Sequence, residues 1–479
     1  MLTKPTSFSV AITVTAGHCN CFHPAGAGIK KNARDSLSIR SANVGKNKIT
    51  RRQFLGGAAA AAVFTIVPRH VLGGAGRTPP SEKLNIACIG IGGMGASDVA
   101  QVSTENIVAL CDVDWRHAAG TFEKYPKAKK YRDFRRMLEK EDNNIDAVTV
   151  STPDNIHAVA AMMAIKKGKH VYCQKPLAHD VFEVRKLTEE ARKHKVMTQM
   201  GIQIHAENAV KWAVEIIKSG MIGKVRKVDI FSNKNWGGGT RPKETPPVPE
   251  TLNWDLWLGP APWRPYHPTY LPGNWRRWWD FGTGTLGDMG CHIIDPVCWA
   301  LDLHYPLSVE ATPGDFNNET YPQKTIVRWE FGERGDLPPV TLTWYDGANN
   351  PPRPEELEAE RNLPGQGGLY YGEKGILLAP HMGSPRLIPE SRMKGFKFPK
   401  AFLPRGVNHY QEWISACKGG PKPSANFDYS GPLTETILLG NIAARAGEKL
   451  LWDGPGLKVT NDAKANEYLK RKYRQGWSL

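Results

Sequence analysis

Residues 84–95, LNIACIGIGGMG, decide the fold of this chain. Leu84 to Gly90 is a short apolar run that ends in glycine, which is typical of a buried parallel strand. A G-x-G-x-x-G pattern follows at the predicted strand-to-helix turn: Gly90, Ile91, Gly92, Gly93, Met94 and Gly95. Such glycines permit a tight turn and let the backbone approach a pyrophosphate at the helix N-terminus. The stretch predicts a dinucleotide site, and a glycine turn without a ligand is the alternative.

A carboxylate stands at the end of the next predicted strand, residues 107–113. Asp112 lies seventeen residues beyond Gly95. At this position an acidic side chain accepts hydrogen bonds from the adenosine ribose and repels a 2′-phosphate, so NAD is favoured over NADP. Arg116 either stacks on the adenine or is a solvated helix residue.

Strand-like and helix-like segments alternate up to residue 200. This alternation predicts βαβ units and a doubly wound parallel sheet, a Rossmann fold of the α/β class, in a domain over residues 81–203. In such a sheet the loops after the strands face one crevice, where ligands bind. The further candidate cofactor ligands in these loops are Thr152, Pro153, Asn155, His157, Gln174 and Lys175.

The sequence changes character after residue 203, with longer loops and many tryptophans. Residues 325–331, 340–345 and 375–379 alternate between apolar and polar side chains. They predict an antiparallel sheet, in an α+β domain over residues 204–479. Helices near residues 408–417 and 433–447 would return to cover it.

A predicted helix that starts at Thr285 carries two chemically active side chains. Asp288 and His292 are four residues apart, so they share one face of that helix. In this arrangement a carboxylate can orient or electrostatically support an imidazole that acts as a base. A surface hydrogen bond within the helix is the alternative reading of the pair.

Six tryptophans lie between residues 254 and 279, just before this helix. Indole faces cover the apolar faces of sugars well and carry one polar N–H, although we assign half of the six to packing. Arg276 either binds substrate or lies in solvent. The candidate substrate-binding residues are Trp275, Arg276, Trp278 and Trp279.

Four motifs together resemble the Gfo/Idh/MocA family of NAD(P)-dependent oxidoreductases, which act mainly on sugars and cyclitols. They are the glycine turn, CDVD at 111–114, STPDNIHA at 151–158 and YCQKPL at 172–177, and the resemblance runs from about Leu84 to the C-terminus. It implies that Lys175 points at the substrate hydroxyl, that Asp288 and His292 join it, and that Gln203 lies near the nicotinamide.

The resemblance also implies a C-terminal domain built on a large, open, mostly antiparallel sheet that binds substrate. Assembly through the open face would give a homodimer or homotetramer, and C-terminal helices would pack back on the Rossmann domain. The family usually has Glu-Lys-Pro where this chain has Gln174-Lys175-Pro176, so the lysine loses one negative neighbour.

Residues 1–80 have the composition of a leader. They hold eleven Lys and Arg and one acidic residue, Asp35, and so account for +10 of the net charge of +16. A nucleic-acid partner is therefore not expected. No metal is expected either, because the histidines lack zinc-like spacing and Asp288 with His292 makes two ligands.

Arg51-Arg52, followed by twelve uncharged residues at 56–67, resembles a twin-arginine signal. The uncharged stretch spans ~18 Å as a helix, against ~30 Å for the membrane core, so a stable membrane span is not expected. The partner would be the twin-arginine export machinery, with cleavage after Ala75 and a periplasmic destination; a basic surface helix is the alternative. A protein that folds before export meets a reducing cytoplasm, so no structural disulfide is expected.

These features predict an exported oxidoreductase with tightly bound NAD. His292 or Lys175 would remove the carbinol proton of a sugar, cyclitol or glycoside while hydride moves to NAD. Free NAD is scarce outside the inner membrane, so the enzyme would retain its cofactor. The bound cofactor would then be returned to its starting redox state without leaving the site. A redox-neutral NAD-dependent glycosidase or epimerase is the first alternative, and a nonenzymatic regulator that responds to NAD or sugar is the second.

Overall fold

The structure is a computed structural model that describes residues 82–315 and 317–479. All of them belong to one compact unit, Pro68–Leu479. The expected export signal, with Arg51-Arg52 and the cleavage site after Ala75, lies outside the described residues. Among the residues described, no helix combines the length and the apolarity that crossing a membrane requires. The six cysteines of the described part are free.

The first sheet is parallel and six-stranded, in the order β3-β2-β1-β4-β5-β6. Its strands are β1 (Asn85–Ile89), β2 (Asn106–Cys111), β3 (Lys129–Tyr131), β4 (Ala147–Val150), β5 (His170–Gln174) and β6 (Thr198–Gly201). The chain order reverses between β1 and β4, which confirms the predicted doubly wound fold and places the ligand crevice above β1. Strand β4 is buried at every residue, because helices cover both faces of a parallel sheet.

Helices connect these strands. They are α2 (Met94–Val102), α3 (Ala119–Lys124), α4 (Phe134–Lys140), α5 (Asp154–Lys166) and α6 (Val181–His194), with the 3-10 helices η2 (Asp142–Asn144) and η3 (Gln203–Ala206). A reciprocal capping box begins α6, in which Asp180 accepts from the Glu183 amide and Glu183 reaches back to the Asp180 amide.

The second sheet has nine strands in the order β13-β12-β11-β7-β10-β9-β8-β14-β15. Neighbours are antiparallel except β7 and β10, which confirms a mostly antiparallel sheet. Burial alternates along β9, as the sequence pattern predicts for a sheet with one covered face. The strands are β7 (Val225–Ser232), β8 (Ser308–Pro313), β9 (Thr325–Phe331), β10 (Val340–Asp346), β11 (Gln366–Gly372), β12 (Gly375–Pro380), β13 (Arg386–Ile388), β14 (Leu450–Asp453) and β15 (Lys458–Val459).

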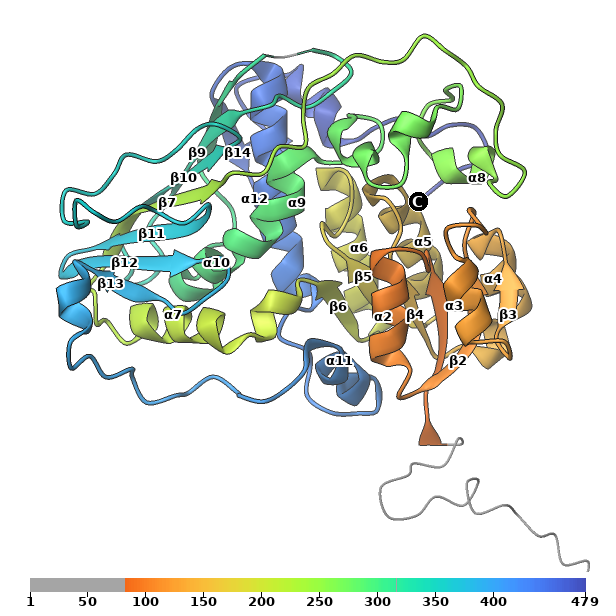
Figure 1. The fold of residues 1–479 in the computed structure, drawn as a ribbon, viewed down its shortest axis with the longest axis horizontal. Helices are drawn as coiled ribbons and strands as arrows, with labels where there is room; N and C mark the ends of the chain where they lie inside the picture. Colours follow the sequence, from red (N-terminus) through yellow and green to blue (C-terminus); the bar gives the residue numbers. More distant parts are fainter. Residues whose placement is uncertain (1–81, 316) are drawn as a thin grey trace, which may run out of the picture. The chain divides into compact units, whose positions relative to one another are not determined.

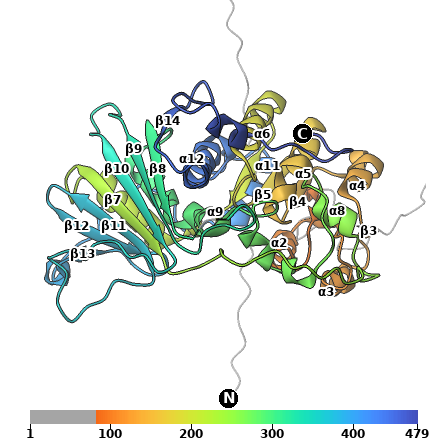
Figure 2. The same cartoon turned by 90° about the horizontal axis from the view of Figure 1, so that it is seen from above.

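Helix α12 (Phe427–Ala446) lies between the two sheets (Figures 1 and 2), where it packs on α6, β8 and α9. It begins six residues before the predicted start at Leu433, because Asn426 caps it through the Asp428 amide and Pro432 is accommodated inside the helix. The other helices of this half are α7 (Asn208–Lys218), α8 (Trp254–Leu258), α9 (Gly284–Ile293), α10 (Asp295–Leu301) and α11 (His409–Cys417), with the 3-10 helices η4 (Pro268–Tyr270), η5 (Asn274–Arg277), η6 (Glu390–Met393) and η7 (Ala465–Leu469).

Candidate active site

The glycine turn between β1 and α2 has no room for side chains. A Cβ on Gly92 would lie 2.1 Å from His117 Cδ2, and a Cβ on Gly95 would lie 2.0 Å from the carbonyl oxygen of Gly90. Within the described chain no side chain caps α2 at Gly93; the Gly95 and Ala96 amides donate to the carbonyl oxygens of Gly92 and Gly93 inside the turn, and Gly92, Gly93 and Met94 line the crevice. A tight, uncapped turn of this kind fits the pyrophosphate of a dinucleotide.

Asp112 stands at the end of β2 beside this turn and lines the crevice. Its carboxylate accepts hydrogen bonds from the amides of Ile91, at 2.8 Å, and Asp114, at 2.9 Å. Burial raises the pKa of Asp112, although these two amide bonds oppose the shift. Each carboxylate oxygen retains a second lone pair, so the group can still accept a ribose hydroxyl.

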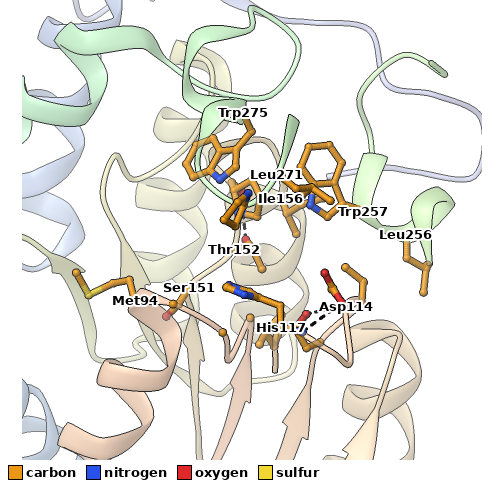
Figure 3. Close-up of a pocket in the computed structure, with 18 of the residues that line it drawn as sticks. Met94, Asp114, His117, Ser151, Thr152, Ile156, Leu256, Trp257, Leu271 and Trp275 are labelled. Carbon is orange, nitrogen blue, oxygen red and sulfur yellow. Dashed lines mark hydrogen bonds between the residues drawn. The ribbon is translucent and has the colours of Figure 1, made fainter. Parts of the chain in front are cut away.

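The crevice is a cavity of about 820 Å³, within the range of roughly 300–1,000 Å³ that is usual for ligand sites. Its floor is the glycine turn with the loops after β2, β4 and β5. A segment that we call the roof, residues 249–273, covers it; Figure 3 shows Trp257, Leu271 and Trp275 on the side opposite Met94, Ser151 and His117. The predicted site residues that line this cavity are Gly90, Gly92, Gly93, Met94, Asp112, Arg116, Thr152, Pro153, Gln174, Lys175, Gln203, Trp275, Arg276 and His292.

Lys175 and Asp288 form an ion pair at one end of the cavity. The Lys175 ammonium donates to Asp288 Oδ1 at 2.5 Å and to the Asp288 carbonyl oxygen at 2.8 Å. Arg276 Nε donates to the same Oδ1 at 3.0 Å, and Trp236 Nε1 donates to Oδ2 at 2.8 Å. Burial alone would raise the pKa of Asp288, but Lys175 and Arg276 outweigh burial and hold it well below its usual range. Asp288 is therefore a permanent anion that positions two cations.

His292 lies one turn further along α9 and lines the same cavity. Its Nδ1 is buried and has no hydrogen-bond partner among the described residues. Burial, together with nearby Lys175 and His381, lowers the pKa of His292 well below its usual range, so the imidazole is neutral at neutral pH. Of the two predicted forms of support by Asp288, the electrostatic one is present, because the carboxylate opposes the lowering of the His292 pKa. The hydrogen bonds of the Asp288 carboxylate go to Lys175, Arg276 and Trp236.

Two family models match consecutive parts of the chain. Residues 84–202 match the oxidoreductase family's NAD-binding Rossmann fold, and residues 206–330 match its C-terminal alpha/beta domain; both models are those of the Gfo/Idh/MocA family. Together they account for about half of the chain. The chain belongs to the Gfo/Idh/MocA family.

Curated relatives of this Gfo/Idh/MocA protein include a myo-inositol 2-dehydrogenase of Thermotoga maritima. It is 30% identical over 152 residues, which are 31% of this chain and 45% of the relative. The chain spans about half the length of the curated relatives that it matches.

Solved structures with 16–17% identity share the fold of this Gfo/Idh/MocA chain. The WlbA dehydrogenase from Bordetella pertussis, in complex with NADH and UDP-GlcNAcA, has a TM-score of 0.55 and 16% identity, with 78% of this chain and 99% of that chain covered. The aldose-aldose oxidoreductase from Caulobacter crescentus, complexed with glycerol, has a TM-score of 0.53 and 17% identity, with 77% and 100% covered.

Some predicted cofactor ligands of this Gfo/Idh/MocA chain hold the cavity walls together instead of lining it. His157 is buried, and its ring nitrogens bond to the carbonyl oxygens of Pro176, at 2.8 Å, and Thr152, at 2.9 Å. Asn155 is also buried, and its Nδ2 donates to the Leu258 carbonyl oxygen in the roof at 2.9 Å. Ile91 and Gly95 belong to the turn but do not line the cavity, and their amides donate to Asp112 and to the Gly92 carbonyl oxygen, so in this structure all four residues support the cavity wall.

Two predicted substrate-binding tryptophans are packing residues. Trp278 is 2% exposed and belongs to the apolar cluster under the roof, which also contains Trp254 and Phe281. Trp279 is 9% exposed, and its Nε1 donates to the Asn317 carbonyl oxygen at 3.1 Å. Trp275 is the tryptophan of the predicted set that lines the cavity, beside Arg276.

Gln174 and Gln203 take part in a buried polar network below the cavity. Gln174 Nε2 donates to Asp98 Oδ1 at 3.1 Å and Oδ2 at 2.9 Å, while Gln203 Nε2 donates to the hydroxyls of Tyr172, at 3.2 Å, and Tyr410, at 3.0 Å. The Tyr410 hydroxyl in turn donates to Asp98 at 2.7 Å. The acidic side chain absent from position 174 is thus present at Asp98 of α2, where burial raises the pKa of the carboxyl group against the hydrogen bonds from Ser151, Tyr410 and Gln174.

The sequence interpretation missed several residues of the cavity wall. Asp114 and His117 lie within four residues of predicted ligands, so proximity to the Asp112 motif was a usable signal. Trp236, which lies behind the wall and donates to Asp288, had no such signal, because an irregular segment brings it there. In residues 82–315 and 317–479, no three His, Cys, Asp or Glu side chains are grouped as metal ligands.

Asp154 is a further missed residue, although it follows the predicted ligands Thr152 and Pro153 directly. It lines the cavity, is 3% exposed and accepts a hydrogen bond from Thr283 Oγ1 at 2.6 Å. Burial raises the pKa of Asp154 to about 7, against the opposing effects of Thr283, Arg276 and Lys175. The carboxyl group therefore gains or loses a proton near neutral pH inside the cavity.

The Asp154→Asn variant is expected to change how stability depends on pH. The folded-state pKa is raised, so the unfolded chain binds fewer protons between about pH 4 and 7 and the wild type loses stability as the pH rises through that window. The variant lacks this loss, so its midpoint temperature should exceed the wild-type value at pH 8 by a few degrees and approach it at pH 4. Thermal unfolding from pH 4 to 8 measures this.

Asp346→Asn is the matched control, because burial also raises the pKa of Asp346, in β10, to about 7. In both variants the midpoint temperature should depend less on pH than it does in the wild type. Asp154→Asn alone should change the pH profile of kcat/KM, because Asp154 lines the cavity and Asp346 lies in the second sheet. A difference in midpoint temperature that is equal at pH 4 and pH 8 contradicts titration of Asp154.

Proposed function

We propose that this protein is an NAD-dependent oxidoreductase that acts on a carbinol carbon of a sugar, cyclitol or glycoside. One observation carries the proposal: Lys175 and His292 line the same cavity as the glycine turn that fits a pyrophosphate. The family membership supports this assignment. When bound, NAD supplies the hydride acceptor and donor.

We assign to Lys175 the hydrogen bond to the substrate oxygen that reacts. An ammonium has three N–H donors, and Asp288 accepts two of them, through Oδ1 and the main-chain oxygen. The third is available to an alcohol oxygen in the cavity. Because Asp288 fixes the ammonium in place, its charge is already oriented toward an alkoxide that develops in the transition state.

His292 is the group that we assign to the carbinol proton. A neutral imidazole accepts a proton, and burial keeps His292 neutral at neutral pH. The His292 ring lines the cavity, so a substrate bound there can reach it. The roof limits the access of water, and Trp275 with Arg276 offers an indole face and a cation to the sugar ring.

Export through the twin-arginine route to the periplasm, retention of NAD through turnover and assembly as a homodimer or homotetramer are parts of the same proposal. Arg51-Arg52 and the uncharged residues 56–67 support export. An enzyme that is exported in the folded state must carry its bound NAD with it. The roof over the cavity is consistent with retention of NAD.

Stopped-flow absorbance of the bound nicotinamide, with a panel of sugars, cyclitols and glycosides, tests the proposal. A net change at 340 nm with an oxidised product identifies a dehydrogenase. A product of lower mass, or an epimer, without net NADH identifies the redox-neutral alternative. If no member of the panel changes the nicotinamide spectrum of a protein that holds NAD, the oxidoreductase assignment is wrong and a regulatory role gains support.

A further inference from the structure

A segment near the C-terminus, residues 470–477, which we call the strap, reaches the dinucleotide cavity at Trp477. It contacts α4, α5, α6 and the roof. Arg471 begins the strap, and its buried guanidinium donates to Glu183 Oε1 at 2.6 Å and to the Asn155 carbonyl oxygen at 2.7 Å. The strap is therefore anchored firmly to the Rossmann half of the protein.

Arg474 ties the strap to the roof. Its guanidinium forms an ion pair with Asp255 of α8 and donates to the carbonyl oxygens of Asp255, at 2.8 Å, and Gly259, at 3.0 Å. Its own amide donates to the Pro260 carbonyl oxygen at 3.0 Å. The strap thus connects α8 directly to the anchor at Arg471.

Trp477 ends the strap and lines the cavity itself. The Arg135 guanidinium lies over its ring at 4.3 Å, and the Phe134 ring lies 6.0 Å away between centroids. Both residues follow β3, which neighbours β2 on the outer side of the parallel sheet. Trp477 therefore stands at the Asp112 end of the cavity, whereas Lys175 and His292 stand at the other end, across β4 and β5.

The strand order indicates which half of a dinucleotide would lie at each end of the cavity. In a doubly wound sheet the ribose carboxylate after β2 marks the adenosine side, and the nicotinamide lies beyond the switch point between β1 and β4. The adenine then lies past Asp112 toward the residues after β3, where Arg132, Phe134 and Trp477 form the wall. An indole is well suited to stack on or cover a purine ring.

The roof is also held by the loop after β2. The Trp115 amide donates to the Thr251 carbonyl oxygen at 3.1 Å, and the Asn253 amide donates to the Val113 carbonyl oxygen at 2.9 Å. The loop after β2 holds the start of α8, where Asn253 is the N-cap, and the strap holds Asp255 and the residues that follow the helix, so both ends of α8 are tied down over the adenosine end.

We propose that the strap is part of the dinucleotide site, with Trp477 as a wall of the adenine subsite and Arg474 as the tie that keeps the roof closed over bound NAD. This rests on the proposed function, because it presupposes that NAD occupies the cavity. Release of NAD then requires the strap and the roof to separate. The strap would then be the physical cause of cofactor retention in the proposed function, although it lies about 380 residues from the glycine turn in sequence.

Release of NADH from the full-length protein tests the strap. The protein is loaded with NADH, chased with excess NAD, and followed by nicotinamide fluorescence. Trp477→Ala and Arg474→Ala should each release NADH roughly 10- to 100-fold faster than wild type. Trp477→Ala should also weaken ADP-ribose about as much as NAD, because both ligands carry the adenosine.

Trp263→Ala is the matched control, because Trp263 belongs to the roof but is 65% exposed and lies outside the cavity wall. It should release NADH at the wild-type rate. Trp477→Phe and Arg474→Lys should be intermediate, and they serve in place of either alanine variant that does not fold. Wild-type release from all strap variants overturns the strap proposal and leaves the proposed function standing, whereas failure of the wild-type protein to bind NAD or NADH overturns both.

Discussion

The Lys175→Ala variant is expected to transfer hydride about 10²- to 10³-fold more slowly than wild type while it still binds NAD. The Lys175 ammonium is held at 2.5 Å by Asp288 Oδ1 and has one N–H left for the substrate oxygen. Loss of one oriented donor to a developing oxyanion typically costs a factor of this size. Single-turnover absorbance at 340 nm, together with the 260 nm absorbance of NAD released on denaturation, measures both quantities.

The fold should tolerate this change, because the Asp288 carboxylate keeps its bonds to Arg276 and Trp236. Lys167→Ala is the matched control: Lys167 also forms an ion pair, with Asp142 at 2.8 Å, but at the far end of α5. It should leave the rate unchanged. A wild-type rate in Lys175→Ala would remove this lysine from the chemistry, and a loss of NAD in parallel with the rate would reassign it to cofactor binding.

Replacing His292 with alanine is expected to lower kcat by about 10²- to 10⁴-fold, the usual contribution of a general base. KM should change less than kcat, because Trp275 and Arg276 still face the substrate. Steady-state kinetics with the best substrate of the panel give both constants. In the wild type, the acid limb of the pH profile should lie below pH 6.5, because burial lowers the pKa of His292.

His381→Ala is the comparison for this variant. The His381 ring lies 5.6 Å from the His292 ring, outside the large cavity and across a smaller one of about 20 Å³. If the His292 imidazole itself takes the proton, loss of His381 should reduce kcat far less than loss of His292. Equal losses would instead indicate that the two rings act as one relay.

The cavity floor could be predicted from the sequence because its residues follow regular strands. Strands β2 and β5 are largely apolar where they are buried, and the residue after each of them, Asp112 or Lys175, is placed by counting strands. The i and i+4 spacing likewise placed Asp288 and His292 on one face of α9.

The roof and the partners of each charge could not be predicted in the same way. Residues 249–273 are largely irregular, so no periodicity shows which side chains face inward. The residues that follow, up to Phe281, pack against this segment, and tertiary contacts decide that Trp278 is buried while Trp275 lines the cavity. The same is true of Asp288, whose neighbours Arg276 and Trp236 come from such segments.

The hydrogen bonds from the Gln174 amide to both oxygens of Asp98 constrain how these two positions can drift during evolution. A glutamate at 174 would set a second acid against Asp98 in a dry interior, where one of the two would have to stay protonated. Positions 98 and 174 are therefore expected to covary. Homologues with an acid at the position of Gln174 should carry a neutral side chain at that of Asp98, and a lineage that exchanges one must soon exchange the other.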